Sequence, residues 1–169
     1  MIVPDVNLLL YAEIDAFPEH RTARTWWQKV LNGDELVGIP GVSLFGFIRL
    51  ATNRRVFTDP LATPDAIARV RGWLDCPGVS FLAPGPNHLE IAFGLLGKLG
   101  TGGNLTTDVQ LAAHAIEQQA ELCSNDLDFG RFSGLRWTNP LVRRTSAPRP
   151  ERARARGQLR APGARLRPR

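Results

Sequence analysis

The sequence is poor in the residues that mark secreted, zinc-binding or membrane-spanning proteins. Its 169 residues include only two cysteines, Cys76 and Cys123, which form no CxxC pair and have no metal-ligand spacing to a histidine. A disulfide framework and a zinc site are therefore not expected, and a reduced compartment, the cytoplasm, is the expected location. No apolar run approaches the roughly 20 residues of a membrane span, and no basic leader precedes Ile2, so no membrane association is expected. Surface or packing roles are expected for His20, His88 and His114.

Negative charge is scarce at the C-terminal end. Residues 142–169 contain ten Arg and one Glu, a balance of +9, so residues 1–141 carry 5 − 9 = −4 of the chain's net charge of +5. The terminal segment has few large apolar residues, and its Pro and Gly interrupt any helix. We therefore expect one folded domain at 1–141 and a disordered tail at 142–169. The tail has two open interpretations, which are binding of RNA phosphates and an extension without a selected role.

Short strand-like runs alternate with helical periodicities within the expected domain. Strands are expected at 2–4, 35–40, 78–84 and 121–124, and helices at 7–14, 18–33, 42–53, 63–75, 87–98 and 106–120. In the second helix, Trp26 and Trp27 lie on one apolar face, which predicts that the pair packs in the core. Strands that alternate with helices of this length indicate an α/β fold with a central parallel sheet flanked by helices.

Polar residues stand where several of these helices begin. Asp5 precedes the first helix, and a lone acid in that position is most often a helix cap. The other expected caps are Thr63, with Pro64 at the first helical position, Asn87, in a capping box with Glu90, and Thr106 or Thr107.

Carboxylates stand where separate segments are expected to meet. Asp5 follows the first strand, Asp126 and Asp128 follow the last, and Asp108 lies in the first turn of helix 106–120. Because ligands of parallel sheets bind at the carboxyl ends of the strands, these acids are expected together at one edge. Carboxylates within about 4 Å repel by roughly 1–4 kcal/mol per pair, which a divalent cation would offset. An all-oxygen ligand set selects Mg²⁺ or Mn²⁺, which indicates metal-assisted attack of water on a phosphodiester.

Three stretches of the sequence carry a resemblance to a known family. They are PDVNLLLYA at the start, FIRLATNRRVF in the middle, and GNLTTDVQLAAHAIEQQAELCSNDLDFGRFSGLRWTNPL at the end. In this order and spacing the chain resembles the PIN-domain ribonucleases, and among them the VapC toxins of VapBC toxin–antitoxin modules, over residues 1–141. The resemblance implies a PIN fold, Mg²⁺-dependent or Mn²⁺-dependent endoribonuclease activity, a homodimer, and inhibition by a cognate VapB antitoxin.

The resemblance also implies roles for individual residues. The metal-binding acids of the family correspond to Asp5, Asp108 and Asp126, with Asp128 as a fourth ligand or an outer group. Two further positions of the family support these acids by hydrogen bonds, and they correspond here to Asn7 and Ser124.

One position departs from the family pattern. The family commonly places a Glu on the helix that reads SLFGFIRLAT, where this sequence has Gly46. We therefore expect one bound ion rather than two. Arg49 and Arg131 are candidates for contacts with RNA phosphates, and ion pairing within the fold is an equal alternative for each.

Two functions of other classes remain open from the sequence. The stretch DLDFG resembles the nucleophile loop of haloacid-dehalogenase phosphatases, in which Asp126 would be phosphorylated, but residues 129–169 contain no Lys for the downstream role that such enzymes need. Alternatively, the lack of an acid at Gly46 is compatible with a catalytically silent domain that binds RNA or an antitoxin.

The charge division leads to a first prediction. Deletion of residues 142–169 should lower RNA affinity, and should reduce the slope of log K against log salt by about 0.7 for each phosphate that the tail would bind. Thermal unfolding of the shortened protein should be unchanged. A salt slope equal to that of the full chain would show that the tail has no part in RNA binding.

Overall fold

The structure is a computed structural model that describes residues 1–100 and 102–142, so the predicted disorder of the tail lies almost wholly outside the described residues. Its centre is a parallel sheet with the strand order β3-β2-β1-β4-β5. The strands are β1 (Ile2–Pro4), β2 (Val37–Pro40), β3 (Val79–Leu82), β4 (Glu121–Cys123) and β5 (Arg136–Thr138). Four of them were expected from the sequence. β5 was missed, because its three residues RWT carry no alternation of apolar and polar side chains.

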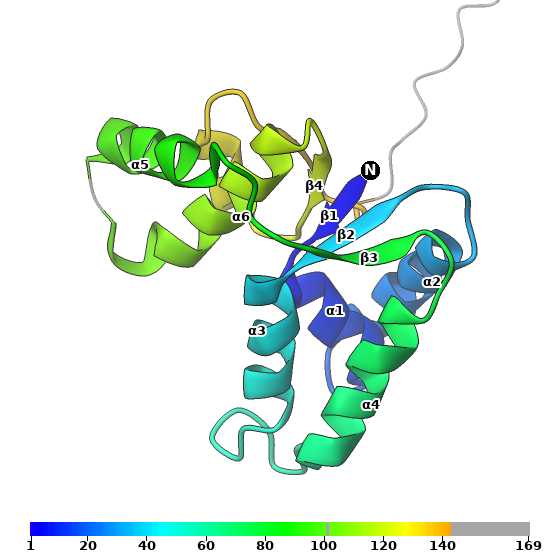
Figure 1. Ribbon diagram of the computed structural model, residues 1–169. Helices are drawn as coiled ribbons and strands as arrows, with labels where there is room; N and C mark the ends of the chain where they lie inside the picture. The colour runs from blue at the N-terminus through cyan, green and yellow to red at the C-terminus, as the bar shows by residue number, and fades with distance from the viewer. Residues whose placement is uncertain (101, 143–169) are drawn as a thin grey trace, which may run out of the picture.

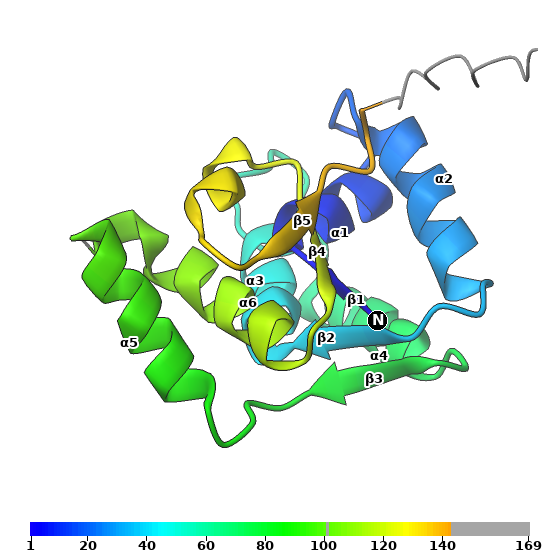
Figure 2. The same ribbon diagram turned by 90° about the horizontal axis from the view of Figure 1, so that it is seen from above.

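Helices cover both faces of the sheet. They are α1 (Val6–Glu13), α2 (His20–Leu31), α3 (Gly41–Ala51), α4 (Thr63–Leu74), α5 (His88–Leu99) and α6 (Thr106–Glu117). The two views of the ribbon show α1 to α4 gathered on one side of the sheet and α5 with α6 on the other (Figures 1 and 2). This arrangement confirms the predicted α/β fold. Among the described helices, none has both the length and the apolar character needed to cross a membrane.

The strands divide the core into two layers because successive side chains point to opposite faces. In β1, Ile2 packs with the layer formed by α1 to α4, whereas Val3 is fully buried in the layer with α5 and α6. In β4, Leu122 is fully buried in the second layer. The short strands are therefore held by apolar contacts on both sides.

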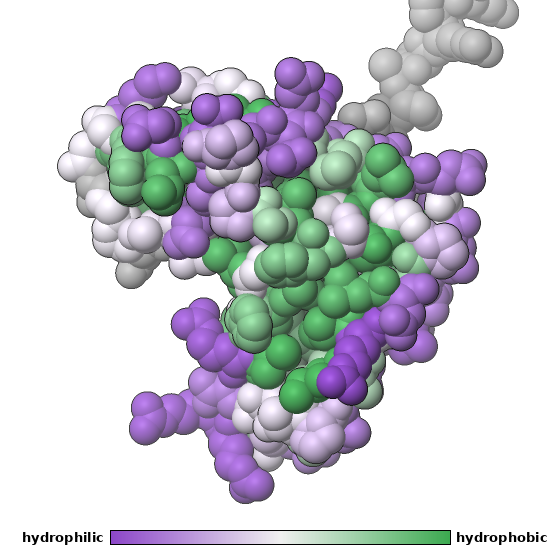
Figure 3. Space-filling model, in the orientation of Figure 1, coloured by the Kyte–Doolittle hydropathy of each residue, from purple (hydrophilic) through white to green (hydrophobic). Residues whose placement is uncertain are grey.

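Apolar side chains also remain at the surface. Phe45, Phe81, Leu89 and Phe93 are each more than half exposed. Figure 3 shows apolar surface across the middle of this view, over β2, β3 and the helices below them. Large exposed apolar patches are typical of surfaces that another molecule covers.

The predicted Trp pair packs on α1 and α4. Trp27 is 2% exposed, while Trp26 is only partly buried at the margin of the same layer. The Trp27 ring meets Trp73 edge to face at a centroid distance of 5.9 Å, and Trp73 meets Phe47 at 4.8 Å. These rings connect α2, α4 and α3.

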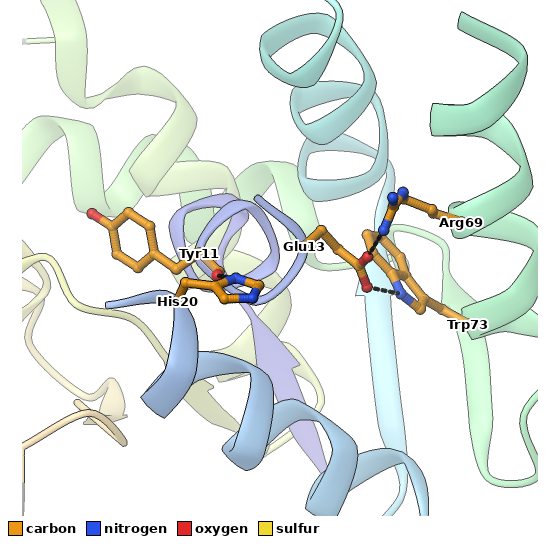
Figure 4. Close-up of polar contacts among 5 residues, drawn as sticks. All are labelled: Tyr11, Glu13, His20, Arg69 and Trp73. Carbon is orange, nitrogen blue, oxygen red and sulfur yellow. Dashed lines mark hydrogen bonds and ion pairs between the residues drawn. The ribbon is translucent and has the colours of Figure 1, made fainter. Parts of the chain in front are cut away.

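Polar contacts fix α1 to two neighbouring helices (Figure 4). The Glu13 carboxylate pairs with the Arg69 guanidinium and accepts a hydrogen bond of 3.3 Å from Trp73 Nε1, which joins α1 to α4. His20 Nδ1 donates to the carbonyl of Tyr11 at 2.8 Å, which joins α1 to the first turn of α2. Because Asp5 caps α1, these contacts also fix the position of that carboxylate.

Two of the expected caps, at Thr63 and at Thr106 or Thr107, are wrong. Thr63 is the first residue of α4 rather than its cap, which is Ala62, although Pro64 lies in the first turn as expected. Neither Thr106 nor Thr107 caps α6. A short 3₁₀ turn at Gly103–Leu105 leads into α6, and the Thr106 hydroxyl donates to the carbonyl of Gly103.

The predicted capping box at Asn87 is replaced by a carboxylate from another helix. Asn87 precedes α5, but its side chain makes no capping hydrogen bond. Instead the buried Glu117 carboxylate, at the end of α6, accepts the backbone N–H groups of Asn87 at 2.7 Å and Gly85 at 2.9 Å. A methyl group at Gly85 would lie 2.5 Å from a Glu117 oxygen, so only glycine permits this approach. Sequence spacing alone could not reveal a partner 30 residues away.

His88 and His114 lie buried beside Glu117, with ring centroids 4.2 Å apart. Burial, and then the neighbouring His88, lower the pKa of His114 to about 4, while Glu117 acts in the opposite direction. The packing role expected for these two histidines is confirmed.

The Trp27 environment leads to a second prediction. Trp27→Ala should lower the free energy of unfolding by about 3–5 kcal/mol, because it leaves a large cavity among rings that cannot close around it. Trp26→Ala, at the partly buried neighbouring position, should cost clearly less. Equal losses in urea unfolding of the two variants would contradict the packing described here.

Candidate active site

The sheet topology brings three separate segments to one edge. β2 and β3 lie on one side of β1, while β4 and β5 lie on the other, so the chain changes direction between β1 and β4. Asp5 follows β1, and Asp126 follows β4 after Ser124 and Asn125. Crevices at such a change of direction are the usual binding sites of open parallel sheets. Asp108, in the first turn of α6, is the acid from the third segment.

Asp5 is 5% exposed and is held on both carboxylate oxygens. Its Oδ1 accepts the Val6 N–H at 2.6 Å, so Asp5 caps α1 as expected. Its Oδ2 accepts the Ser124 hydroxyl at 2.6 Å. Burial raises the pKa of Asp5 to about 6, against the effect of these hydrogen bonds and with a further contribution from the charge of Asp126. Asp5 is thus a cap and a buried acid at the same time.

Ser124 connects the β1 and β4 segments. Besides donating to Asp5, its oxygen accepts hydrogen bonds from Asn7 Nδ2 and from the Asp126 N–H, both at 3.0 Å. Asn7 Oδ1 is buried and has no hydrogen-bond partner among the described residues. Ser124 therefore bonds directly to Asp5, and the Asn7 side chain reaches this acid through Ser124. Their roles toward a metal remain predictions.

The pKa of Asp108 is raised by its surroundings, which include the other carboxylates. Burial, followed by the charges of Asp5, Asp126 and Asp128, raises the pKa of Asp108 to about 6. The charges of three predicted acids thus act on the fourth, Asp108, and the charge of Asp126 acts on Asp5 as well. Within the described residues, however, no three acidic, imidazole or thiol side chains converge tightly enough to enclose a metal ion.

Asp126 and Asp128 are the more exposed acids of the group. Asp126 Oδ1 accepts the Asp128 N–H at 2.8 Å and caps the 3₁₀ helix Leu127–Arg131. The Asp128 carboxylate lies 3.6 Å from the Arg131 guanidinium, with both side chains about half exposed. Arg131 thus forms an ion pair within the fold, which was the alternative to a contact with RNA. Arg49 is exposed and forms no ion pair within the described part of the chain.

Gly46, on α3, faces the Val6 side chain of α1. A methyl group added at Gly46 would lie 3.2 Å from Val6 Cγ2, in the residue directly after Asp5. A Glu at this position would therefore need Val6 to move. At this position α3 packs closely on α1, and no side chain supplies a further carboxylate.

Two residues that sequence reasoning did not select hold the backbone of the site. The buried Ser43 hydroxyl donates to the carbonyl of Pro4 at 2.8 Å, and Trp137 Nε1 donates to the carbonyl of Ser124 at 3.2 Å. Ser43 belongs to no motif, and Trp137 lies on the strand that was missed. Neither residue carried a sequence signal for a hydrogen bond to this backbone.

Comparison with known proteins agrees with this geometry. Residues 2–135 match the family described as PIN domain. Ribonuclease VapC33 of Mycobacterium tuberculosis is 58% identical over 141 residues, which are 83% of this chain and 99% of the relative. The chain belongs to the VapC branch of the PIN-domain family. Ribonuclease VapC37 of the same organism is 40% identical over 83% of this chain and 97% of its own length.

Solved structures share the PIN fold of this VapC-type chain at low sequence identity. Mycobacterium tuberculosis VapC20, described as a toxin that cleaves the sarcin–ricin loop, superposes with a TM-score of 0.59 at 18% identity, over 80% of this chain and 99% of that one. The VapBC-1 structure from nontypeable Haemophilus influenzae gives a TM-score of 0.59 at 20% identity, over 84% of this chain and all of that one. At such identities these structures support the fold alone.

The raised acid pKa values lead to a third prediction. A folded pKa of about 6 for Asp5, against 3.8 for an ordinary Asp, means that its contribution to stability is present below about pH 4 and is lost as the pH rises through 6. In EDTA, Asp5→Asn should therefore gain stability relative to the parent protein between pH 4.5 and 7.5, by roughly 2–3 kcal/mol. Differential scanning calorimetry of the parent and the variant measures this difference in stability. His114 also titrates, but it is present in both proteins, so its contribution cancels. A difference independent of pH would contradict the raised pKa.

Proposed function

We propose that this protein is a metal-dependent endoribonuclease, the toxin of a VapBC toxin–antitoxin module. The observation that carries the proposal is the convergence of Asp5, Asp108 and Asp126 at one edge of a PIN-type sheet, where burial and then the charges of neighbouring acids raise the pKa of Asp5 and of Asp108 to about 6. Among the described residues, the one ion pair formed by Asp5, Asp108, Asp126 or Asp128 joins Asp128 to Arg131. A substrate phosphate could not approach such a site without a cation. Two relatives, VapC33 and VapC37, are named ribonucleases, which supports the proposed activity on RNA.

The donor set fits a hard divalent cation. Asp5, Asp108 and Asp126 would hold one Mg²⁺ or Mn²⁺, with Asp128 as an outer group, once the exposed carboxylates turn toward Asp5. Asn7 Oδ1, buried and unpartnered among the described residues, is a further oxygen of the right kind. When bound, the ion supplies a water of lowered pKa and neutralises charge that develops on the phosphate.

The chain's own residues orient this site. The Ser124 hydroxyl and the Val6 N–H fix the two oxygens of Asp5, so its carboxylate cannot rotate freely. Ser124 also receives the Asp126 N–H, which sets the spacing between the β1 and β4 acids. This preorganisation lowers the cost of bringing like charges together in the reacting complex.

The two rival functions differ in their support. Membership in the PIN-domain family leaves the phosphatase alternative, with Asp126 as nucleophile, without an observation in its favour. One observation is compatible with the silent alternative. Gly46 packs against Val6 at the position where the family commonly has a Glu, so this position supplies no carboxylate ligand to a metal. RNA binding without cleavage would identify the silent form.

Partners follow from the same assignment. The structural neighbours include VapBC complexes, so we assign a VapB-type antitoxin as a partner. The cytoplasm remains the location expected from the two unpaired cysteines. A second copy of the chain is assigned to the exposed apolar face of α5, where Leu89 and Phe93 are 62% and 59% exposed beside an apolar groove.

A fourth prediction tests the activity. Purified protein without antitoxin should cleave total RNA in Mg²⁺ or Mn²⁺, and Asp5→Asn should lower the rate by more than about 100-fold, because the buried acid of the metal site is removed. Chelation with EDTA should have the same effect. Gel analysis of end-labelled RNA measures the rates.

Asp65→Asn is the matched control for this experiment. Asp65 is an exposed acid in the first turn of α4, outside the acidic group, and its variant should cleave at the parental rate. Cleavage that persists in Asp5→Asn, or in EDTA, would contradict the proposed mechanism.

A further inference from the structure

α3 leads away from the acidic edge of the sheet. Its cap is Pro40 at the end of β2, and Ser43 in its first turn is bonded to the Pro4 carbonyl beside Asp5. The helix has 11 residues, so its far end lies about 16 Å from its start. That distance spans several nucleotides of a single strand. Anything bound at the far end of α3 is therefore within reach of an RNA whose scissile phosphate lies at the acids.

The far end of α3 carries three arginines. Arg49 lies in the last turns of the helix, and Arg54 and Arg55 lie in the loop that follows. All three are exposed, and none forms an ion pair within the described part of the chain, although Asp59 lies in the same loop. Figure 3 shows hydrophilic side chains projecting at the lower left, where Figure 1 places this loop. We call Arg49, Arg54 and Arg55 the α3 arginine patch.

The loop that presents these arginines is fixed to the fold. Arg55 N–H donates to Asn53 Oδ1 at 2.9 Å, and Leu61 N–H donates to the Ala51 carbonyl at 2.9 Å, which closes the loop at its base. The Phe57 ring packs edge to face on Phe17 at a centroid distance of 5.6 Å. Packing of Phe57 against the region after α1 thus leaves the two arginine side chains directed outward from an anchored backbone.

We propose that the α3 arginine patch binds backbone phosphates of single-stranded RNA next to the cleavage site. This inference rests on the proposed ribonuclease function. Residues 1–141 carry a net charge of −4, so the folded domain as a whole repels RNA and needs local cations to hold it. Guanidinium groups suit this role because they bind phosphate oxygens in a bidentate manner and stay charged. Contacts of this kind position the strand without reading its sequence.

An acidic segment of a protein partner is the competing occupant of such a patch. RNA is favoured because α3 connects the patch to the carboxylates at which a phosphodiester would react. An acidic protein segment has no reason to follow that path, since the acids at its other end would repel it. Binding of RNA and binding of an acidic peptide by the same variants separate the two occupants.

Binding of labelled, unstructured 12-nucleotide RNA in EDTA tests the proposal by fluorescence anisotropy over a series of NaCl concentrations. Arg54→Gln/Arg55→Gln in the full chain should reduce the slope of log K against log salt by about 1.4, which is two single-strand phosphate contacts at about 0.7 each. Arg49→Gln should add a further reduction. The double variant should unfold at the parental temperature.

Arg21→Gln/Arg24→Gln provides a control with the same change of charge on the exposed face of α2. A salt slope of Arg54→Gln/Arg55→Gln equal to that of this control would overturn the patch while leaving the ribonuclease proposal intact. Parent protein that neither binds nor cleaves RNA would overturn both. Weaker binding of a labelled oligoglutamate peptide by the patch variant, with unchanged RNA binding, would assign the patch to a protein partner and overturn the proposal.

Discussion

Electrostatic repulsion among carboxylates at one sheet edge is the constraint on which the rest of the site depends. Asp5 is buried, and its pKa is raised to about 6 although two hydrogen bonds favour its charged form. Asp108 comes from a different segment, and its pKa is raised to the same level, first by burial and then by the charges of Asp5, Asp126 and Asp128. A fold holds such groups together only when packing elsewhere opposes their separation.

That packing comes from both layers of the core. On one side, the rings of Trp27, Trp73 and Phe47 join the helices that position α1, whose cap is Asp5. On the other side, α5 and α6 pack together around the buried Glu117, and this pair carries Asp108 to the edge. Ser124 then connects the segments after β1 and β4 by its hydrogen bonds with Asp5 and Asp126. The apolar core thus stabilises an arrangement that its acidic edge disfavours.

The sequence was sufficient for the parts of this arrangement that are local or periodic. Alternating strands and helices predicted the parallel sheet. The positions of Asp5, Asp126 and Asp128 after strands, with Asp108 in the first turn of a helix, predicted the shared edge. Contacts between distant segments were not accessible. Glu117 displaced the expected capping box at Asn87, and β5, with Trp137 behind Ser124, had no periodic signal. The closeness of Gly46 to Val6 likewise depends on how α3 crosses α1, which no local pattern records.

Direct titration of Mn²⁺ tests the central claim, which is that acids from three segments form one cation site. Isothermal titration calorimetry of the antitoxin-free protein should give one saturable site per chain. Saturable binding should disappear in Asp108→Asn, because Asp108 lies far from Asp5 in the sequence and joins it only in the folded protein. Binding should persist in Asp65→Asn. Equal binding by the parent and Asp108→Asn, or no saturable binding by the parent, would contradict the account.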